Sequence, residues 1–128
     1  MLNLDPSTRV FLCSQLIDMR FSFDALCGLV TTYFGMNPLN GHVFVFFSRR
    51  RDRMKVLFWD IDGFALYYKR LERGSYSWIM ELGLEANGEM QASDFSLILA
   101  GINPYPSSQK RTGKRLKQST EIQAVAQL

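Results

Sequence analysis

The sequence has little cysteine and histidine and no long apolar run. Its 128 residues include two cysteines, Cys13 and Cys27, and one histidine, His42. A structural zinc site needs four such ligands, and there is no Cys-x-x-Cys pair, so we expect reduced thiols and no metal or other cofactor. No apolar stretch approaches the roughly 20 residues of a membrane span, and the first ten residues lack the features of a signal peptide. These absences predict a cytoplasmic protein that does not enter membranes.

The chain also lacks the common catalytic motifs. It contains no P-loop, no Gly-x-Ser-x-Gly, no His-Glu-x-x-His and no Rossmann glycine pattern. Hydrophobic residues make up 47% and charged residues 21%, which is typical of a globular domain and excludes collagen-like and fully disordered chains. We expect a loose leader over residues 1–8 and a single domain over residues 9–103.

Positive charge is concentrated in two segments. Through Asn103 there are ten Lys and Arg against eleven Asp and Glu, whereas from Pro104 onward there are five against one. Residues 104–128 are therefore predicted to form a basic, mobile tail. The second segment, residues 49–55, holds four arginines and a lysine with one aspartate. Such clusters favour an anionic partner such as nucleic acid; the alternative is that the arginines are solvated and aid solubility.

The apolar pattern predicts an α+β fold, with an antiparallel sheet of three to five strands covered on one face by two helices. The helix over residues 22–35 has one apolar stripe, begins after the N-cap residue Ser22 and ends at Gly35. A short helix is expected over residues 94–100. Strands are expected over residues 10–13, 43–47, 54–59, 64–71 and 76–80, and a loop or short hairpin over residues 83–91.

The turn between the two longest predicted strands decides where the charges lie. With Asp62-Gly63 as the turn pair, Lys55 lies opposite Arg70 and Arg53 opposite Glu72. Two distant basic segments then converge at the end of the sheet opposite the turn. Like charges held together favour binding of phosphate, and an exposed ring of Tyr67 or Tyr68 suits stacking on a base. The predicted nucleic-acid-binding residues are Arg49, Arg50, Arg51, Arg53, Lys55, Lys69, Arg70 and Arg73.

For two further groups of polar residues, the sequence allows more than one role. Asp18-Met19-Arg20, with Asp24, fits a helix cap, an ion pair or a contact site. Asp60 and Asp62, with Glu72 or Glu81 as a third ligand, suggest a metal-dependent nuclease, but an aspartate beside glycine is what a hairpin turn requires on its own. The turn interpretation is preferred, and His42 is interpreted as a residue at the start of a strand.

Several segments together resemble a known family. They are Asp18-Met19-Arg20, Phe-Asp-Ala-Leu at 23–26, Gly-His-Val-Phe-Val-Phe at 41–46, and RRRDRxKxLxWDxDGFxLxYKRLExG at 49–74. In this order, from about Val10 to Asn103, they resemble the TnpB-type accessory protein of the insertion-sequence-sixty-six (IS66) family. Phe21, where the family often has lysine, and Ile79, where proline often follows the tryptophan, are departures from its pattern.

The resemblance implies a non-enzymatic accessory factor of DNA transposition, acting beside a separate transposase and another element-encoded protein. Taken with the basic segments, it predicts binding of DNA through the arginine-rich hairpin loop. The alternative is a protein–protein adaptor for the transposase that does not contact DNA. A metal-dependent nuclease is the least favoured reading.

Overall fold

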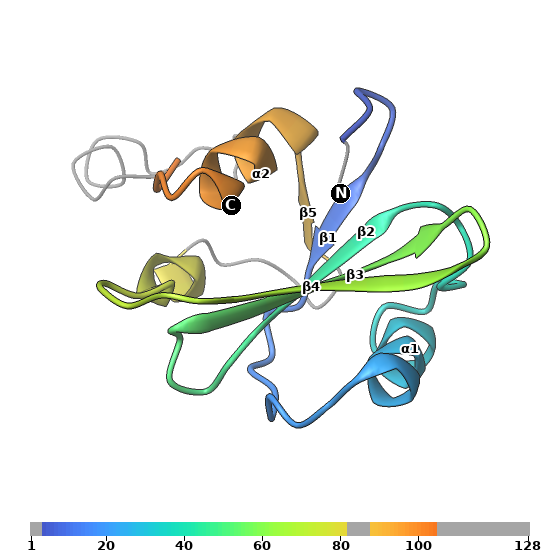
Figure 1. Cartoon of the computed structure of the whole chain (residues 1–128), viewed down its shortest axis with the longest axis horizontal. Coiled ribbons are helices and arrows are strands. Elements are labelled where there is room, and N and C mark those ends of the chain that lie inside the picture. Colours follow the sequence, from blue (N-terminus) through green and yellow to red (C-terminus); the bar gives the residue numbers. More distant parts are fainter. Residues whose placement is uncertain (1–3, 82–87, 105–128) are drawn as a thin grey trace.

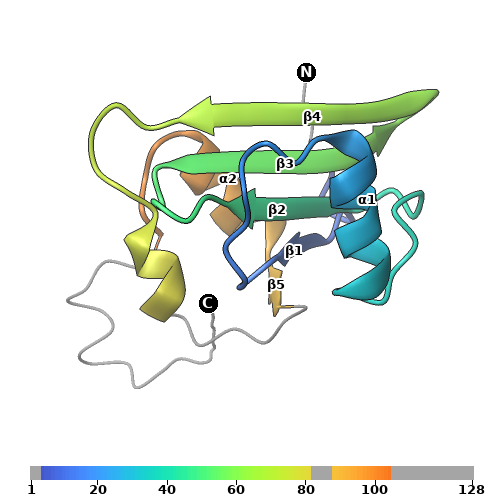
Figure 2. The same cartoon turned by 90° about the horizontal axis from the view of Figure 1, so that it is seen from below.

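A five-stranded mixed sheet organises the protein. The computed structural model describes residues 4–81 and 88–104. In chain order the strands are β1 (Val10–Leu12), β2 (Val43–Phe47), β3 (Arg53–Asp60), β4 (Gly63–Arg70) and β5 (Gly88–Met90). Their order across the sheet is β4-β3-β2-β1-β5, and only β1 and β2 run parallel (Figure 2). The predicted α+β class, with a mainly antiparallel sheet, is confirmed.

The helices cover both faces of this sheet. Helix α1 (Phe23–Thr32) lies on one face, whereas α2 (Ala92–Leu99) and the 3-10 helix η1 (Ser77–Glu81) lie on the other (Figure 1). The prediction that both helices cover one face is therefore wrong. All five residues of β2 are buried, and a strand with two apolar faces must be covered on both sides.

The core is accordingly divided into two layers. On the α1 side, Leu26, Val30 and Phe34 pack on Phe44 and Phe46 of β2. The layer on the α2 side contains the alternate strand residues together with two residues of α2. Its main members are Val10, Leu12, Val43, Val45, Phe47, Met54, Val56, Phe95 and Ile98.

The β3–β4 hairpin is two residues out of its predicted register. Gly63 pairs with Asp60, so Ile61 and Asp62 form the turn. In place of the predicted pairs, Lys55–Arg70 and Arg53–Glu72, the hairpin pairs Arg53 with Arg70 and Lys55 with Tyr68. The observed register places Trp59 opposite Phe64, with ring centroids 5.1 Å apart in an edge-to-face arrangement, and such cross-strand aromatic pairs stabilise a hairpin. A shift of two residues keeps every side chain on its predicted face.

The hairpin turn carries backbone strain. Ile61 has a φ of 57° and its side chain is 92% exposed, although β-branched residues rarely adopt this region. We expect Ile61→Gly to raise the free energy of unfolding by about 0.5–1 kcal/mol, since the strain relieved exceeds the added entropy of the unfolded chain. Urea unfolding measures the change. Leu39→Gly is the control, because Leu39 is exposed without a positive φ; equal destabilisation by the two changes would contradict the prediction.

Two other predicted segments differ from the structure. Tyr76 and the residues after it do not form a strand, because the chain continues into η1. The Ser77 N–H donates to Ser75 Oγ at 3.2 Å, a local contact that competes with strand pairing. Within the predicted loop at 83–91, residues Gly88–Met90 form β5. The predicted basic tail, beyond residue 104, lies outside the described residues.

Candidate nucleic-acid interface

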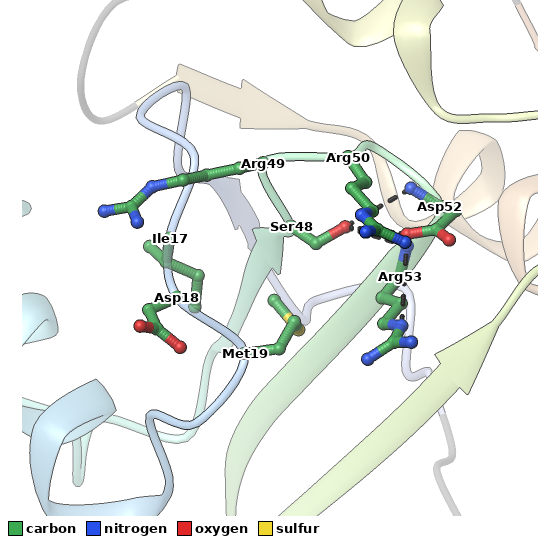
Figure 3. A pocket seen from close by; sticks show the side chains of 8 residues that line it. All are labelled: Ile17, Asp18, Met19, Ser48, Arg49, Arg50, Asp52 and Arg53. Carbon is green, nitrogen blue, oxygen red and sulfur yellow. Dashed lines mark hydrogen bonds and ion pairs between the residues drawn. The ribbon is translucent and has the colours of Figure 1, made fainter.

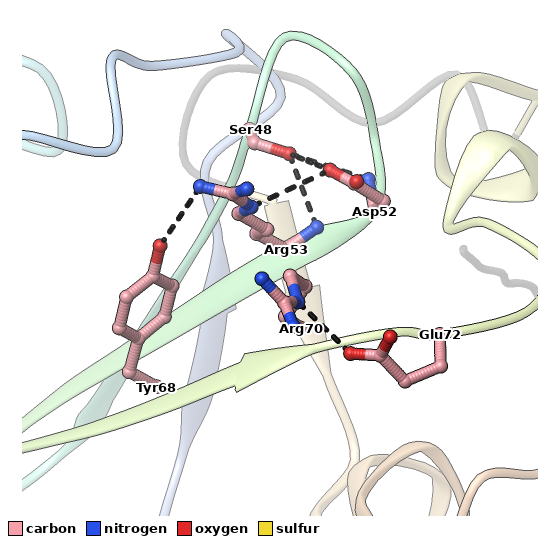
Figure 4. A network of polar contacts seen from close by, with 6 residues as sticks. All are labelled: Ser48, Asp52, Arg53, Tyr68, Arg70 and Glu72. Atoms are coloured by element: carbon pink, nitrogen blue, oxygen red, sulfur yellow. Dashed lines mark hydrogen bonds and ion pairs between the residues drawn. The ribbon is translucent and has the colours of Figure 1, made fainter.

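The arginine-rich loop between β2 and β3 has a fixed conformation. The Ser48 side chain organises it, because Ser48 Oγ donates to Asp52 Oδ1 at 3.2 Å and accepts from the Arg53 N–H at 3.1 Å (Figure 4). The Arg51 N–H donates to the Ser48 carbonyl, and Arg51 itself has a φ of 63°. The loop therefore presents its arginines from a hydrogen-bonded turn.

The segment after β4 is bound to this loop through the main chain. The Leu71 N–H donates to the Asp52 carbonyl at 2.7 Å, and the Tyr76 N–H donates to the Arg51 carbonyl at 2.6 Å. Arg53 and Arg70 are direct cross-strand partners. The predicted convergence of the two basic segments at the end of the sheet opposite the hairpin turn is thus observed.

An open hollow of about 430 Å³ lies where the loop meets the chain that precedes α1. Figure 3 shows its arginine side chains spread around it, with Arg49 extending away from Arg50 and Arg53. Ser48 and Ile17 join their two segments by a parallel bridge. The lining residues are Ile17, Asp18, Met19, Ser48, Arg49, Arg50, Asp52 and Arg53.

One carboxylate of this hollow is already paired. Arg20 Nη2 donates to Asp18 Oδ2 at 2.6 Å, and the Arg20 N–H donates to Asp18 Oδ1. The Arg20 guanidinium holds the pKa of the Asp18 carboxyl well below its usual range, and Arg49 lowers it further. Of the roles that the sequence left open for Asp18, the structure shows the ion pair. Asp18 is therefore negatively charged, and the hollow contains this carboxylate and Asp52 together with three arginines.

Arg70 lies beside Arg53 on the α1 side of the sheet. Arg70 Nε donates to Glu72 Oε2 at 2.9 Å, and its side chain stays 59% exposed. Arg53 Nε is buried with no hydrogen-bond partner among the described residues, and it lies 4.0 Å from Asp52 Oδ1. Each of these guanidiniums has one acidic neighbour within 4.0 Å in the described part of the chain, which leaves donors of both available.

Arg51 and Arg73 lie at the same end of the sheet but do not line the hollow. The Arg51 carbonyl accepts from the N–H of Tyr76, a residue of the α2-side core, and Arg51 Nε is buried with no hydrogen bond to residues 4–81 or 88–104. Arg73 is exposed in the connection that follows β4. The geometry therefore separates these two from Arg49, Arg50 and Arg53.

Lys55 is a buried structural residue. Its side chain is only 6% exposed, and Nζ donates to the carbonyls of Met19 at 2.7 Å and Phe21 at 2.6 Å. The same ammonium lies 4.7 Å from the centroid of the Tyr68 ring. Lys55 thus holds one wall of the hollow against the sheet. Its ammonium group is occupied by two carbonyls and an aromatic ring. The sequence offered one indication of this role, because Lys55 lies inside a predicted strand whose neighbouring residues are apolar.

Lys69 belongs to the other face of the sheet. It lies opposite Met54, a residue of the α2-side core, and Nζ is 3.4 Å from the Leu99 carbonyl at the end of α2. A positive charge at the C-terminus of a helix is favourable. Because Lys69 and Arg70 are consecutive in a strand, their side chains point to opposite faces, a separation that the adjacent positions in the sequence already implied.

The remaining candidate ligands are dispersed. Asp60 and Asp62 lie at the hairpin turn, at the opposite end of the β3–β4 pair from Glu72. Burial raises the pKa of the Cys13 thiol to about 11, and His42 Nδ1 accepts from the Arg9 N–H at 3.1 Å. No group of three or more histidine, cysteine or acidic residues within 4–81 and 88–104 is arranged to hold a metal ion.

None of the helices in the described ranges is long and apolar enough to cross a membrane.

Comparison with known proteins identifies the family of the chain. The family model described as IS66 Orf2-like protein (TnpB_IS66) matches residues 8–109.

The chain belongs to the IS66 Orf2-like family. Two relatives come from Sinorhizobium fredii (strain NBRC 101917 / NGR234), and both are named only as uncharacterized proteins. The chain is 37% identical to y4hO over 104 residues, which cover 80% of this chain and 88% of y4hO. It is 32% identical to y4jC over 95 residues, which cover 74% and 80% of the two chains. No solved structure matches. Membership of the IS66 Orf2-like family indicates a transposition accessory protein.

Proposed function

We propose that this protein supports transposition by binding the phosphates of DNA in the arginine hollow, in cooperation with a separate transposase. Arg49, Arg50 and Arg53 provide the contacts inside the hollow, and Arg70 extends the positive surface along β4. This narrows the eight residues suggested by the sequence to four, since Lys55 and Lys69 have structural partners and Arg51 and Arg73 lie outside the hollow.

The observation that carries the proposal is the direct pairing of Arg53 with Arg70 beside a loop held in one conformation. Like charges directly opposite in a sheet are destabilising, and an anionic partner removes that cost. In the described part of the chain, no carboxylate lies within ion-pair distance of Arg49 or Arg50. Guanidinium groups bind phosphate oxygens in a bidentate manner, and contacts to phosphate give affinity without requiring a base sequence.

Binding of a short fluorescent duplex DNA, measured by anisotropy at several salt concentrations, tests the proposal. We expect Arg49→Ala/Arg50→Ala to weaken binding about tenfold or more at low salt. The slope of log K against log salt should become shallower by about two, because each phosphate contact contributes about 0.9.

The matched comparison is Arg50→Ala against Lys69→Ala, since both remove one positive charge but only Arg50 lines the hollow. Equal losses would assign binding to net charge and contradict the proposed site. No binding of the wild-type protein to either duplex or single-stranded DNA at low salt would contradict DNA contact and support the adaptor alternative. Mg²⁺-dependent cleavage of the DNA that is lost in Asp60→Asn would support the nuclease alternative instead.

A further inference from the structure

An exposed aromatic ring lies beside the arginine hollow. Tyr68 is 49% exposed and lies on the α1 side of β4, between the positions of Leu66 and Arg70. Arg53 Nη1, at 3.4 Å, donates to the Tyr68 hydroxyl (Figure 4). The ring is therefore linked directly to one of the arginines proposed to bind phosphate.

The Tyr68 ring is held in place by its cross-strand neighbour Lys55. The buried Lys55 ammonium lies 4.7 Å from the ring centroid and is itself fixed by two main-chain carbonyls. A cation against the face of an aromatic ring is stabilising. Because the Lys55 ammonium lies against one face of the ring, the exposed area of Tyr68 belongs to the rest of the side chain.

Two further exposed rings belong to the segment that leads from this wall into α1. Phe21 and Phe23 are 37% and 42% exposed, and the Phe21 carbonyl shares the Lys55 ammonium with the Tyr68 ring. The Phe21 N–H donates to the Asp18 carbonyl, so Phe21 closes the turn whose first residues line the hollow. Phe21 is therefore joined through its main chain both to the Lys55–Tyr68 pair and to the segment that lines the hollow.

We propose that the site binds single-stranded DNA in preference to duplex, with phosphates on Arg49, Arg50 and Arg53 and an unpaired base stacked on Tyr68. This inference rests on the proposed function and specifies its substrate. The bases of a duplex are already stacked on their neighbours and offer no free face to a ring. Single strands are bound by a positive groove with aromatic platforms, and a stacked base contributes substantially to affinity.

The test compares a fluorescein-labelled fifteen-nucleotide oligothymidine with a duplex of the same length at one salt concentration. We expect the wild-type protein to bind the single strand more tightly. Tyr68→Leu, which keeps an apolar cover over Lys55, should weaken binding of the single strand about tenfold and change duplex binding less than twofold. Tyr67→Leu is the matched control, because the adjacent Tyr67 lies on the opposite face, opposite Val56 of the α2-side core.

A second variant reports stacking directly and shows that the protein remains folded. Tyr68→Trp should retain tight binding, and its added tryptophan fluorescence should be quenched by the oligothymidine, whereas the fluorescence added by Tyr67→Trp should not. Unselective binding of both DNAs, or no selective effect of Tyr68→Leu, would overturn the inference while leaving the proposed function intact. No binding of either DNA would overturn both.

Discussion

Replacing Phe44 with alanine is expected to lower the free energy of unfolding by about 3–5 kcal/mol. Phe44 is fully buried at the centre of the α1-side core. Its ring stacks on Phe11 at a centroid distance of 5.7 Å and contacts Phe34 at 5.3 Å. The change removes a large apolar side chain and leaves a cavity between the sheet and α1, which the rigid strand cannot fill by moving.

Urea or thermal unfolding, followed by circular dichroism, measures this loss. For a domain of this size the midpoint of thermal unfolding should fall by more than about 10 °C. Phe23→Ala is the matched control, because Phe23 is 42% exposed and its removal should cost less than about 1 kcal/mol. A loss for Phe44→Ala no larger than for Phe23→Ala would show that α1 does not pack on β2 as described.

The second large effect is expected for Lys55→Met, which should destabilise the protein by about 2–4 kcal/mol. Methionine fills a similar volume but leaves the carbonyls of Met19 and Phe21 without the donor they have in the native protein. A buried acceptor without a partner costs about 1–3 kcal/mol. Loss of this donor should also free the turn that contains Arg20, whose side chain is 90% exposed.

Two measurements separate this effect from a loss of charge. Urea unfolding should show a much smaller change for Lys69→Met, because the hydrogen bond of Lys69 Nζ to the Leu99 carbonyl is long, at 3.4 Å. Limited proteolysis with trypsin should cut after Arg20 faster in Lys55→Met than in the wild type. If the two lysine variants unfold alike and Arg20 remains protected, Lys55 does not hold the wall of the hollow.

The elements with a strong local pattern were predictable from the sequence. The helical spacing of Leu26, Val30 and Phe34 gave α1, and the run of β-forming residues gave the bounds of β2 without error. By contrast, β5 has only three residues. It depends on pairing with β1 and on a bidentate ion pair in which Arg9 Nε and Nη2 lie 2.9 and 2.8 Å from Glu89. A contact between residues eighty positions apart leaves no local signal.

The location of the candidate site, at one end of the β3–β4 hairpin, was also predictable from the sequence. A hairpin brings its two ends together in any register near the true one, so the convergence of the 49–53 and 70–73 segments did not depend on the error of two residues. The hydrogen bonds that remove Lys55 from the surface come from Met19 and Phe21, in a segment preceding α1. Charge counting shows where lysines are, but tertiary contacts decide which of them remain free.

The position of β1 between β2 and β5 has a consequence for synthesis of the protein. One edge of this strand, with buried apolar side chains on both faces, has no partner until residues 88–90 have emerged from the ribosome. At 5–20 residues per second that interval lasts roughly ten seconds. A nascent chain interrupted before residue 88 exposes this edge to other nascent chains, so aggregation is expected of premature termination products rather than of the finished domain.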